Sequence, residues 1–311
     1  MNPAYSVILF TTASGAGYGL LALTAMAGAG HGRASTVAFA LTTLFIALAL
    51  ITTGLLSSTL HLGRPERAWR AFSQWRTSWL SREGLAAIVT YPLAMAFGLC
   101  WSGLVDAPQF IAPLGYATAI LCTVTVFCTA QIYATLKTIP AWNSPLTLLV
   151  YLMFALATGS AWLMAISVFF GRFQAGAGNF QAFFTLISIF AVIVLKFIYW
   201  RKLRHAKGQY TMAAATGLGE GVRQWEVPHT STNFIMKEMG YQVARRQARK
   251  LQQICMVLLD VCFVLTFVTP KYPEVAYLIV PIIMLATWME RWLFFAQAEH
   301  VVGLFYGKER V

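Results

Sequence analysis

The sequence predicts an all-α membrane protein with eight transmembrane helices in a bundle and an interfacial amphipathic helix at about 65–76. The first observation behind this prediction is composition. Of the 311 residues, 58% are hydrophobic and only 11% are charged, whereas soluble domains carry about 25% charged residues. The second is a series of long apolar runs, and the third is the shortness of most polar connections between them. We therefore expect residues 1–311 to form a single integral membrane domain.

Eight apolar runs are long enough to cross a bilayer, which requires roughly 20 mainly apolar residues. They lie at about 7–29, 36–60, 83–104, 110–136, 145–170, 180–200, 251–269 and 275–298. The first run has no positively charged leader and exceeds the roughly 7–15 apolar residues of a signal-peptide core, so we expect a retained helix. Within it, Gly15 and Gly19 have the spacing of small residues at close helix crossings, which predicts a packing role for both.

The basic residues gather on one side of this predicted topology, and the net charge is +12. The side with both termini and the even-numbered connections holds eighteen Lys and Arg: five in 61–82, Lys137, ten in 201–250 and two after 307. The other side holds three, Arg33, Arg172 and Lys271, and two more lie within spans. Because Lys and Arg accumulate in cytoplasmic loops, we expect both termini on the cytoplasmic side of a bacterial inner membrane. Topology thus explains most of the basic charge, and no nucleic-acid partner is expected.

The first long connection, 61–82, carries the densest polar cluster of the chain. Pro65 suits the first position of a helix, and Trp69, Phe72 and Trp75 recur every three residues. This pattern predicts a helix at headgroup level with its aromatic side chains on one face. Ser81 is expected to cap the third span, which would place Glu83 in the first turn of that span.

The second long connection, 201–250, is hydrophilic and contains a basic helix from about 233. A connection of this length usually has a function or is disordered. Two interpretations stay open from the residues alone: a solvated, lipid-facing helix, or a docking surface for a partner subunit.

His61 and Glu83 bracket the first long connection, so the helix ends that carry them can meet at one depth of the membrane. A quinone head has two carbonyl oxygens that accept hydrogen bonds, and its reduction takes up two protons. His61 can donate to one oxygen and titrates near neutral pH, and Glu83 can exchange protons with water. Arg67 can orient that carboxylate or stabilise negative charge, and Gly63 allows close approach of the ring. The competing interpretation is an interfacial anchor in which His61 and Glu83 only bond to backbone or headgroups.

Metal-binding groups are sparse. Of the five histidines, only His61 and His300 stand at ends of spans, so a haem between them is a weaker alternative. The cysteines fall within or at the ends of spans without a CxxC pair, as buried small hydrophobic residues do: Cys100, Cys122, Cys128, Cys255 and Cys262. We therefore expect no haem and no metal in this chain, and any electron-carrying metal in another one.

Ionisable residues inside spans are functional candidates by default. Asp260 lies roughly 13 Å, at 1.5 Å per residue, from the cytoplasmic end of the seventh span, and Glu290 and Arg291 lie at similar depth in the eighth. An Asp260–Arg291 ion pair is one expectation, and a proton path from the quinone site through these residues is the other. Lys196 lies near its helix end and is expected to extend its amine to the surface.

The stretches HLGRPERAW (61–69) and SWLSRE (78–83) resemble the signature of the membrane anchor subunits of the dimethyl sulfoxide reductase family. This group includes anchors of cytoplasmic sulfite dehydrogenases, and RQWEVPHTSTNFIMKEMGYQVARRQARKL (223–251) resembles that branch. The likeness covers essentially the whole chain. It implies that the chain holds no metal and binds ubiquinone or menaquinone near a four-cluster iron–sulfur subunit, which contacts a molybdopterin catalytic subunit. The family's quinol-site residues fall on His61, Gly63, Arg67 and Glu83.

The resemblance also implies roles for the two long connections: 61–82 would form the quinone site, and 201–250 would dock the iron–sulfur subunit. Dimethyl sulfoxide reductase is typically exported, which would put its partner subunits outside, whereas the charge count here puts them in the cytoplasm. This favours electron transfer from sulfite oxidation to quinone, with the sulfur chemistry performed by another subunit. The alternative within the family is the anchor of a dimethyl sulfoxide, polysulfide or thiosulfate/tetrathionate reductase that oxidises menaquinol.

Two other classes of function remain open. Secondary transporters show broken helices in related halves and polar sites at mid-membrane; no internal repeat is evident here, although Asp260 fits such a site. A purely structural tether is the other alternative. An iron–sulfur partner that co-purifies would exclude the transporter, and quinone-dependent activity would exclude the tether.

Overall fold

The computed structural model describes residues 3–60, 62, 64–173, 179–206, 210–219, 221–222, 225–226 and 243–306. Eight helices in these residues are long and apolar enough to cross a membrane, which confirms the predicted all-α fold and its eight spans. They are α1 (Tyr5–His31), α2 (Val37–Thr59), α3 (Trp79–Ser102), α4 (Ile111–Ala134), α5 (Pro145–Phe169), α6 (Asn179–Ala206), α9 (Val243–Val268) and α10 (Ala276–Ala296).

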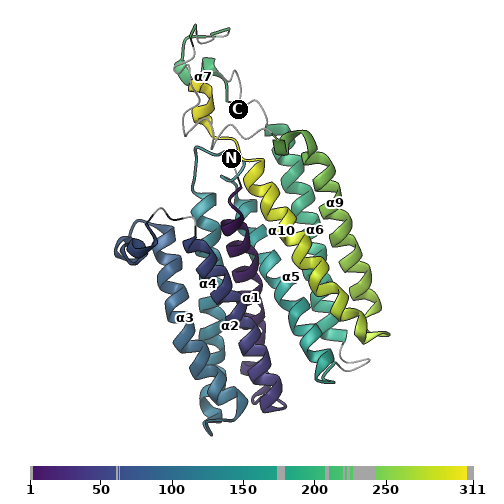
Figure 1. The fold of residues 1–311 in the computed structure, drawn as a ribbon. Helices are drawn as coiled ribbons and strands as arrows, with labels where there is room; N and C mark the ends of the chain where they lie inside the picture. Colours follow the sequence, from purple (N-terminus) through teal and green to yellow (C-terminus); the bar gives the residue numbers. More distant parts are fainter. Residues whose placement is uncertain are drawn as a thin grey trace.

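Helix α1 runs through the middle of the bundle (Figure 1). It contacts α2 and α4 on one side and α5 and α10 on the other. It is also the most buried of the eight spans, with Ile8, Leu20 and Leu21 fully inaccessible. The spans therefore form two groups, α1 to α4 and α5, α6, α9 and α10, with α1 packed at the boundary between them.

Small residues bring α1 close to its neighbours. A Cβ atom on Gly19 would lie only 1.8 Å from the carbonyl oxygen of Ala155 on α5, and Gly159 faces Gly19 across the same crossing. Gly15, in contrast, has no atom within 4 Å of its Cβ position. The predicted packing role is therefore right for Gly19 and wrong for Gly15.

The two termini and the longer extramembrane elements lie at one end of the bundle (Figure 1). These elements are the 3₁₀ helices η1 (Pro65–Gln74) and η4 (Val301–Tyr306) and the short helix α7 (Met212–Thr216). Met212 of α7 packs against Leu304 of η4. At the opposite end lie the short turns η2 (Pro108–Phe110) and η3 (Pro273–Val275). Part of the predicted docking segment, including 227–242, falls outside the described residues.

The interfacial helix forms where the sequence predicts it, but as a 3₁₀ helix that projects beside the end of α3 (Figure 1). The side chains of Trp69 and Trp75 are 66% and 52% exposed. Phe72 instead lies against α3, because a Cβ atom on Gly84 would approach its ring within 2.6 Å. The predicted aromatic face is thus divided between packing on α3 and exposure on the outside of the molecule.

The start of α3 differs from the prediction by one turn. Ser78, not Ser81, is the N-cap, and its side chain accepts a hydrogen bond from the backbone N–H of Ser81. The Ser81 hydroxyl instead donates to the carbonyl oxygen of Ala71 in η1. Because the helix begins at Trp79, Glu83 lies in the second turn rather than the first. This shift moves Glu83 away from the helix end and into the bundle.

Candidate functional site

A cavity of about 630 Å³ lies between η1 and the ends of α1 to α4. Ligand pockets for small molecules are typically about 300–1,000 Å³ and mainly apolar, with a few polar groups. The helix residues on its walls are Val7, Phe10, Leu55, Ser58, Thr59, Ala68, Ala71, Phe72, Leu80, Glu83, Gly84, Ala87, Ile88, Tyr91, Ile132 and Tyr133. Leu80 and Ile88 are each 53% exposed, so one wall reaches the outer, apolar surface of the bundle.

Glu83 is the carboxylate of this cavity. Its side chain is buried, with 3% of the residue exposed, and its Oε1 is hydrogen-bonded to Oγ1 of Thr129 on α4. This hydrogen bond joins Glu83 to a side chain of a neighbouring span. Burial next to an apolar cavity is expensive for a charged group, which makes Glu83 a candidate for a functional residue.

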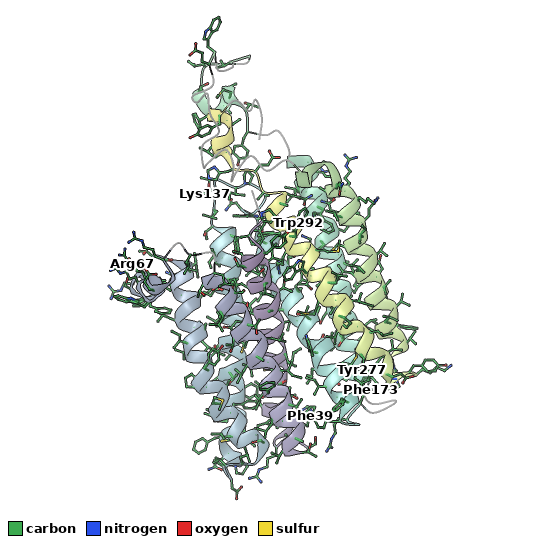
Figure 2. The ribbon with its side chains drawn as sticks, viewed as in Figure 1. Phe39, Arg67, Lys137, Phe173, Tyr277 and Trp292 are labelled. Atoms are coloured by element: carbon green, nitrogen blue, oxygen red, sulfur yellow. The ribbon has the colours of Figure 1, made fainter. Side chains whose placement is uncertain are left out.

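Arginines from the η1 segment complete the polar part of the cavity. Arg64 and Arg67 both line it, and both are exposed at its outer side; Figure 2 shows Arg67 on η1 at the edge of the molecule. The hydroxyl of Tyr91, another wall residue, lies 2.7 Å from Oγ1 of Thr52 on α2. The structure therefore brings Arg67 and Glu83, which are 16 positions apart, to one cavity.

His61 and Gly63 lie outside the described residues. The described residues beside them, Leu62 and Arg64, both line the cavity. The site assigned from the sequence is thus represented in the structure by Arg67 and Glu83, together with the chain on either side of Gly63.

Thr129 and Tyr133 are site residues that the sequence did not indicate. They lie one turn apart on α4. Thr129 bonds to Glu83, and Tyr133 lines the cavity with its ring stacked against Tyr151 at a centroid distance of 5.8 Å. A threonine or tyrosine within an apolar run carries no local signal, because its role depends on which helix packs opposite.

The match to a known family covers nearly the whole chain. A family model described as the DMSO reductase anchor subunit (DmsC) matches residues 1–307. The chain belongs to this anchor subunit family. It is also 31% identical over 331 residues to a sulfite dehydrogenase subunit of Allochromatium vinosum, an alignment that covers 98% of this chain and 99% of that protein. The protein is therefore a multi-pass membrane anchor of an oxidoreductase complex with catalytic and iron–sulfur partners, which favours that class over a transporter.

The anchor also contains a buried cluster of charged residues, and its pairing differs from the prediction. The Nζ of Lys196 on α6 lies 2.7 Å from Oε1 of Glu290 on α10, and Nη1 of Arg291 lies 3.0 Å from Oε2 of the same carboxylate. Asp260 is exposed on α9, so the expected Asp260–Arg291 pair is wrong. The acidic partner of Arg291 is instead the preceding residue of the same helix.

Lys196, expected to reach the surface, is fully buried. Helix α6 continues to Ala206, ten residues further, or about 15 Å at 1.5 Å per residue. The amine is therefore too deep to reach the helix end. Its ammonium lies over the rings of Tyr199 and Trp200, at 4.1 and 4.5 Å from their centroids.

The remaining candidate metal ligands in the described part of the anchor are His300 and the five cysteines. Nδ1 of His300 accepts a hydrogen bond of 3.0 Å from the backbone N–H of Val302 in η4, and burial lowers the pKa of His300. All five cysteines are buried and free. Among the described residues no cluster of three or more His, Cys, Asp or Glu could hold a metal ion. His61, the second histidine of the haem alternative, lies outside the described residues.

Proposed function

We propose that this anchor binds a quinone in the cavity beneath η1 and passes electrons between its iron–sulfur partner and the membrane quinone pool. The observation that carries the proposal is a buried carboxyl, Glu83, in the wall of a cavity that reaches the lipid-facing surface. The cavity fits the group. Its walls are mainly apolar, as a quinone ring and isoprenoid tail require, and its polar groups include guanidinium donors for carbonyl oxygens.

The chain's own residues would bind the ring and manage its protons. A bound quinone supplies two-electron chemistry that consumes or releases two protons. Glu83 would hold one proton on a carboxyl oxygen that faces the cavity, while Thr129 fixes the other oxygen. Arg64 and Arg67 would orient the ring by donating to a carbonyl oxygen. His61 is assigned by the resemblance as the second proton-exchanging group, and Gly63 as the residue that permits close approach.

We further propose that the complex oxidises sulfite to sulfate and reduces ubiquinone or menaquinone. The support is the 31% identical relative, which is named as a sulfite dehydrogenase subunit, and the charge asymmetry of the connections. Eighteen cations lie on the side of both termini and three on the other, which favours cytoplasmic termini in a bacterial inner membrane. The cavity lies at that same end of the bundle, so the molybdopterin and iron–sulfur subunits would also be cytoplasmic.

The iron–sulfur subunit would dock on the extramembrane elements beside the termini. These elements include the connection 201–250 with its ten cations, together with α7 and η4, which pack on each other. A single partner seated there would also lie at the membrane end that holds the quinone cavity. This arrangement would bring a cluster of the partner close to the ring.

The test compares Glu83→Gln and His61→Ala with Glu66→Gln, which changes an exposed carboxyl on η1. The first two variants should assemble and keep activity with artificial electron acceptors, while turnover with quinone falls by about 10²-fold or more, as when an acid–base group is lost. Glu66→Gln should behave like the wild type. Full quinone turnover in both site variants would remove these residues from the site.

The substrate assignment has its own measurement. The purified complex should reduce quinone with sulfite as electron donor. Oxidation of menaquinol by dimethyl sulfoxide, polysulfide, thiosulfate or tetrathionate, without activity on sulfite, would show the reverse direction of electron flow.

A further inference from the structure

A second, smaller cavity lies on the other side of Thr129 from the proposed quinone site. It is enclosed by α1, α4, α5 and α10, and its walls include Thr129, Tyr18, Tyr151 and Arg291. Thr129 therefore connects the two cavities, because it lines the small one and bonds to Glu83 in the wall of the large one.

The small cavity contains buried polar atoms that have no hydrogen-bond partner among the described residues. These atoms include the hydroxyls of Thr12, Tyr18 and Tyr151 and the Nε of Arg291. Buried polar groups in proteins are almost always paired with protein or with ordered water. The cavity has room for about one water molecule, and a polar cavity of that size is where buried water is found.

The charged cluster adds a net positive charge at this place. Lys196, Glu290 and Arg291 are all at most 1% exposed, and their formal charges sum to +1. Arg291 is held over the ring of Tyr151, at 3.6 Å from the ring centroid, and it is the member of the cluster that lines the cavity. Its donors cannot be removed by deprotonation, because arginine stays charged in proteins.

Thr129 can serve Glu83 in either protonation state. Its Oγ1 lies within bonding distance of Glu83 Oε1 and, at 3.0 Å, of the carbonyl oxygen of Thr125. When Glu83 is ionised, the Thr129 hydroxyl donates to the carboxylate. When Glu83 is protonated, the carboxyl donates to Oγ1, and the Thr129 proton turns to the Thr125 carbonyl. A hydroxyl has two acceptor positions, so Oγ1 can also accept a hydrogen bond from the small cavity.

We propose that the small cavity binds an ordered water molecule, held by Arg291, Tyr18 and Tyr151, that donates a hydrogen bond to Thr129. Thr129 is then a positioning residue. The water fixes its hydroxyl, the hydroxyl fixes Oε1 of Glu83, and the second carboxyl oxygen is left to face the quinone cavity. A quinone displaces water from the large cavity, so this inner water, acting through the Thr129 hydroxyl, is the link to water that Glu83 retains when the site is filled. The water site stands on its own geometry, and only its effect on turnover rests on the proposed quinone site.

The first test is a cryo-electron microscopy map of the quinone-free complex at a resolution that shows ordered water. Density is expected in the small cavity within hydrogen-bond distance of Arg291 and Thr129. A dry cavity in the wild-type complex would overturn the proposal.

The second test measures the infrared carboxyl band of Glu83, identified by its loss in Glu83→Gln, in the same quinone-free complex. Tyr18→Phe with Tyr151→Phe removes two hydroxyls that hold the water, although neither is hydrogen-bonded to Glu83. The Glu83 band should shift in this double variant. Tyr199→Phe is the matched control, because its buried hydroxyl donates to the carbonyl oxygen of Ala141 at 2.7 Å and lies outside the cavity. Equal bands in the wild type and the double variant would contradict coupling through water.

The third test separates the hydroxyl of Thr129 from its shape. Thr129→Val should shift the Glu83 band and lower quinone turnover about tenfold, less than the loss of the acid–base group itself. Thr129→Ser, which keeps the hydroxyl, should restore both. Thr90→Val should change neither, because the buried Thr90 hydroxyl on α3 donates to the carbonyl oxygen of Ala86 at 2.8 Å and lines neither cavity. An unchanged band in Thr129→Val, or no rescue by serine, would exclude the positioning role. If the water and the band shifts are found but Glu83→Gln retains full quinone turnover, the proposed function fails while the water site stands.

Discussion

At the level of single residues, Glu66 and Glu83 differ in how deeply their side chains are buried. Glu66 on η1 is exposed, whereas Glu83 on α3 is 3% exposed and bonded to Thr129. Their side-chain chemistry is the same, but only Glu83 lines the cavity. A carboxyl that must exchange protons with a membrane-soluble ring has to lie at such a boundary, within reach of both lipid and polar groups.

The sequence could assign Glu83 and Arg67 to one site, because one connection joins the two helix ends and because its motif resembles that of a known family. It could not predict that Thr129 bonds to Glu83, that Tyr133 lines the cavity, or that Lys196 pairs with Glu290. Each lies in an apolar run, and the helix that faces it comes from a distant part of the chain. The Asp260 prediction failed for the same reason, since depth in the membrane can be counted from a helix end but the direction of a side chain cannot.

The crossing of α1 and α5 gives a prediction at single residues. Gly19→Ala should lower the thermal stability of the purified protein, because its Cβ would meet the carbonyl oxygen of Ala155; overpacking of this kind costs about 1–3 kcal/mol. Gly30→Ala, near the end of the same helix in open space, should be neutral or stabilising, because alanine favours a helix by about 1 kcal/mol over glycine. Apparent melting temperatures of both variants in detergent provide the measurement. A Gly19 variant as stable as the Gly30 variant would contradict the close crossing.

At the level of elements, η1 is held in place mainly by α3. Ser81 donates to the carbonyl oxygen of Ala71, and Arg82 donates from Nε and Nη2 to the carbonyl oxygens of Trp75 and Arg76 at 2.9 and 2.7 Å. These contacts satisfy the carbonyl groups at the end of η1, which a short helix leaves without internal partners. The first turn of α3 therefore holds η1 in its position over the cavity.

The spans were predictable because they depend on composition, and their observed bounds follow the predicted ones within a few residues at most ends. The helix type of η1 and the cap of α3 were not. Both depend on which of several nearby serines and backbone groups pair, and this choice is made by contacts between η1 and α3 rather than by local pattern.

Removing the hydrogen bonds of the Arg82 side chain to Trp75 and Arg76 should make η1 more mobile. Arg82→Gln loses two charge-assisted hydrogen bonds and the stacking of its guanidinium on Trp79, 4.3 Å from the ring centroid. Backbone amides of 65–76 should then exchange hydrogen about tenfold faster, since bonds from charged groups contribute about 1.5–3 kcal/mol each before solvent screening. Arg70→Gln is the control, because Arg70 lies on η1 and its guanidinium stacks on Trp69 of the same helix, 5.6 Å from the ring centroid. Exchange that is equally fast in both variants would show that the Arg82 hydrogen bonds do not hold η1 in place.

In the whole molecule, one helix group forms the large cavity and the other carries the buried charged cluster. The group α1–α4 with η1 forms the lipid-accessible cavity, and α6 and α10 carry the buried charged cluster. Helix α1 lies between them and lines both cavities, through Val7 and Phe10 in one and Tyr18 in the other. The boundary between the two groups is thus where the carboxyl of the proposed site and the positive cluster approach each other.

The orientation of the whole bundle is testable by the position of its termini. The marked chain ends and η1 (Figure 1) lie at one end of the molecule, as does Lys137 (Figure 2). By the predicted topology, the connections and tails on this side carry eighteen of the cations, against three on the other side. By the positive-inside rule the end with the termini should face the cytoplasm. A reporter fused after Val311 that is active only in the cytoplasm should therefore be active, and one that requires export should be silent.

Fusions placed in the connection between α5 and α6, on the opposite side, should show the reverse pattern and serve as the control. If the exported reporter were active at the C-terminus, the cavity and the partner subunits would lie outside the cytoplasm. The assignment to cytoplasmic sulfite oxidation would then fail, whereas quinone binding at Glu83 would remain to be decided by its own variants, because the cavity and its carboxyl are the same in either orientation.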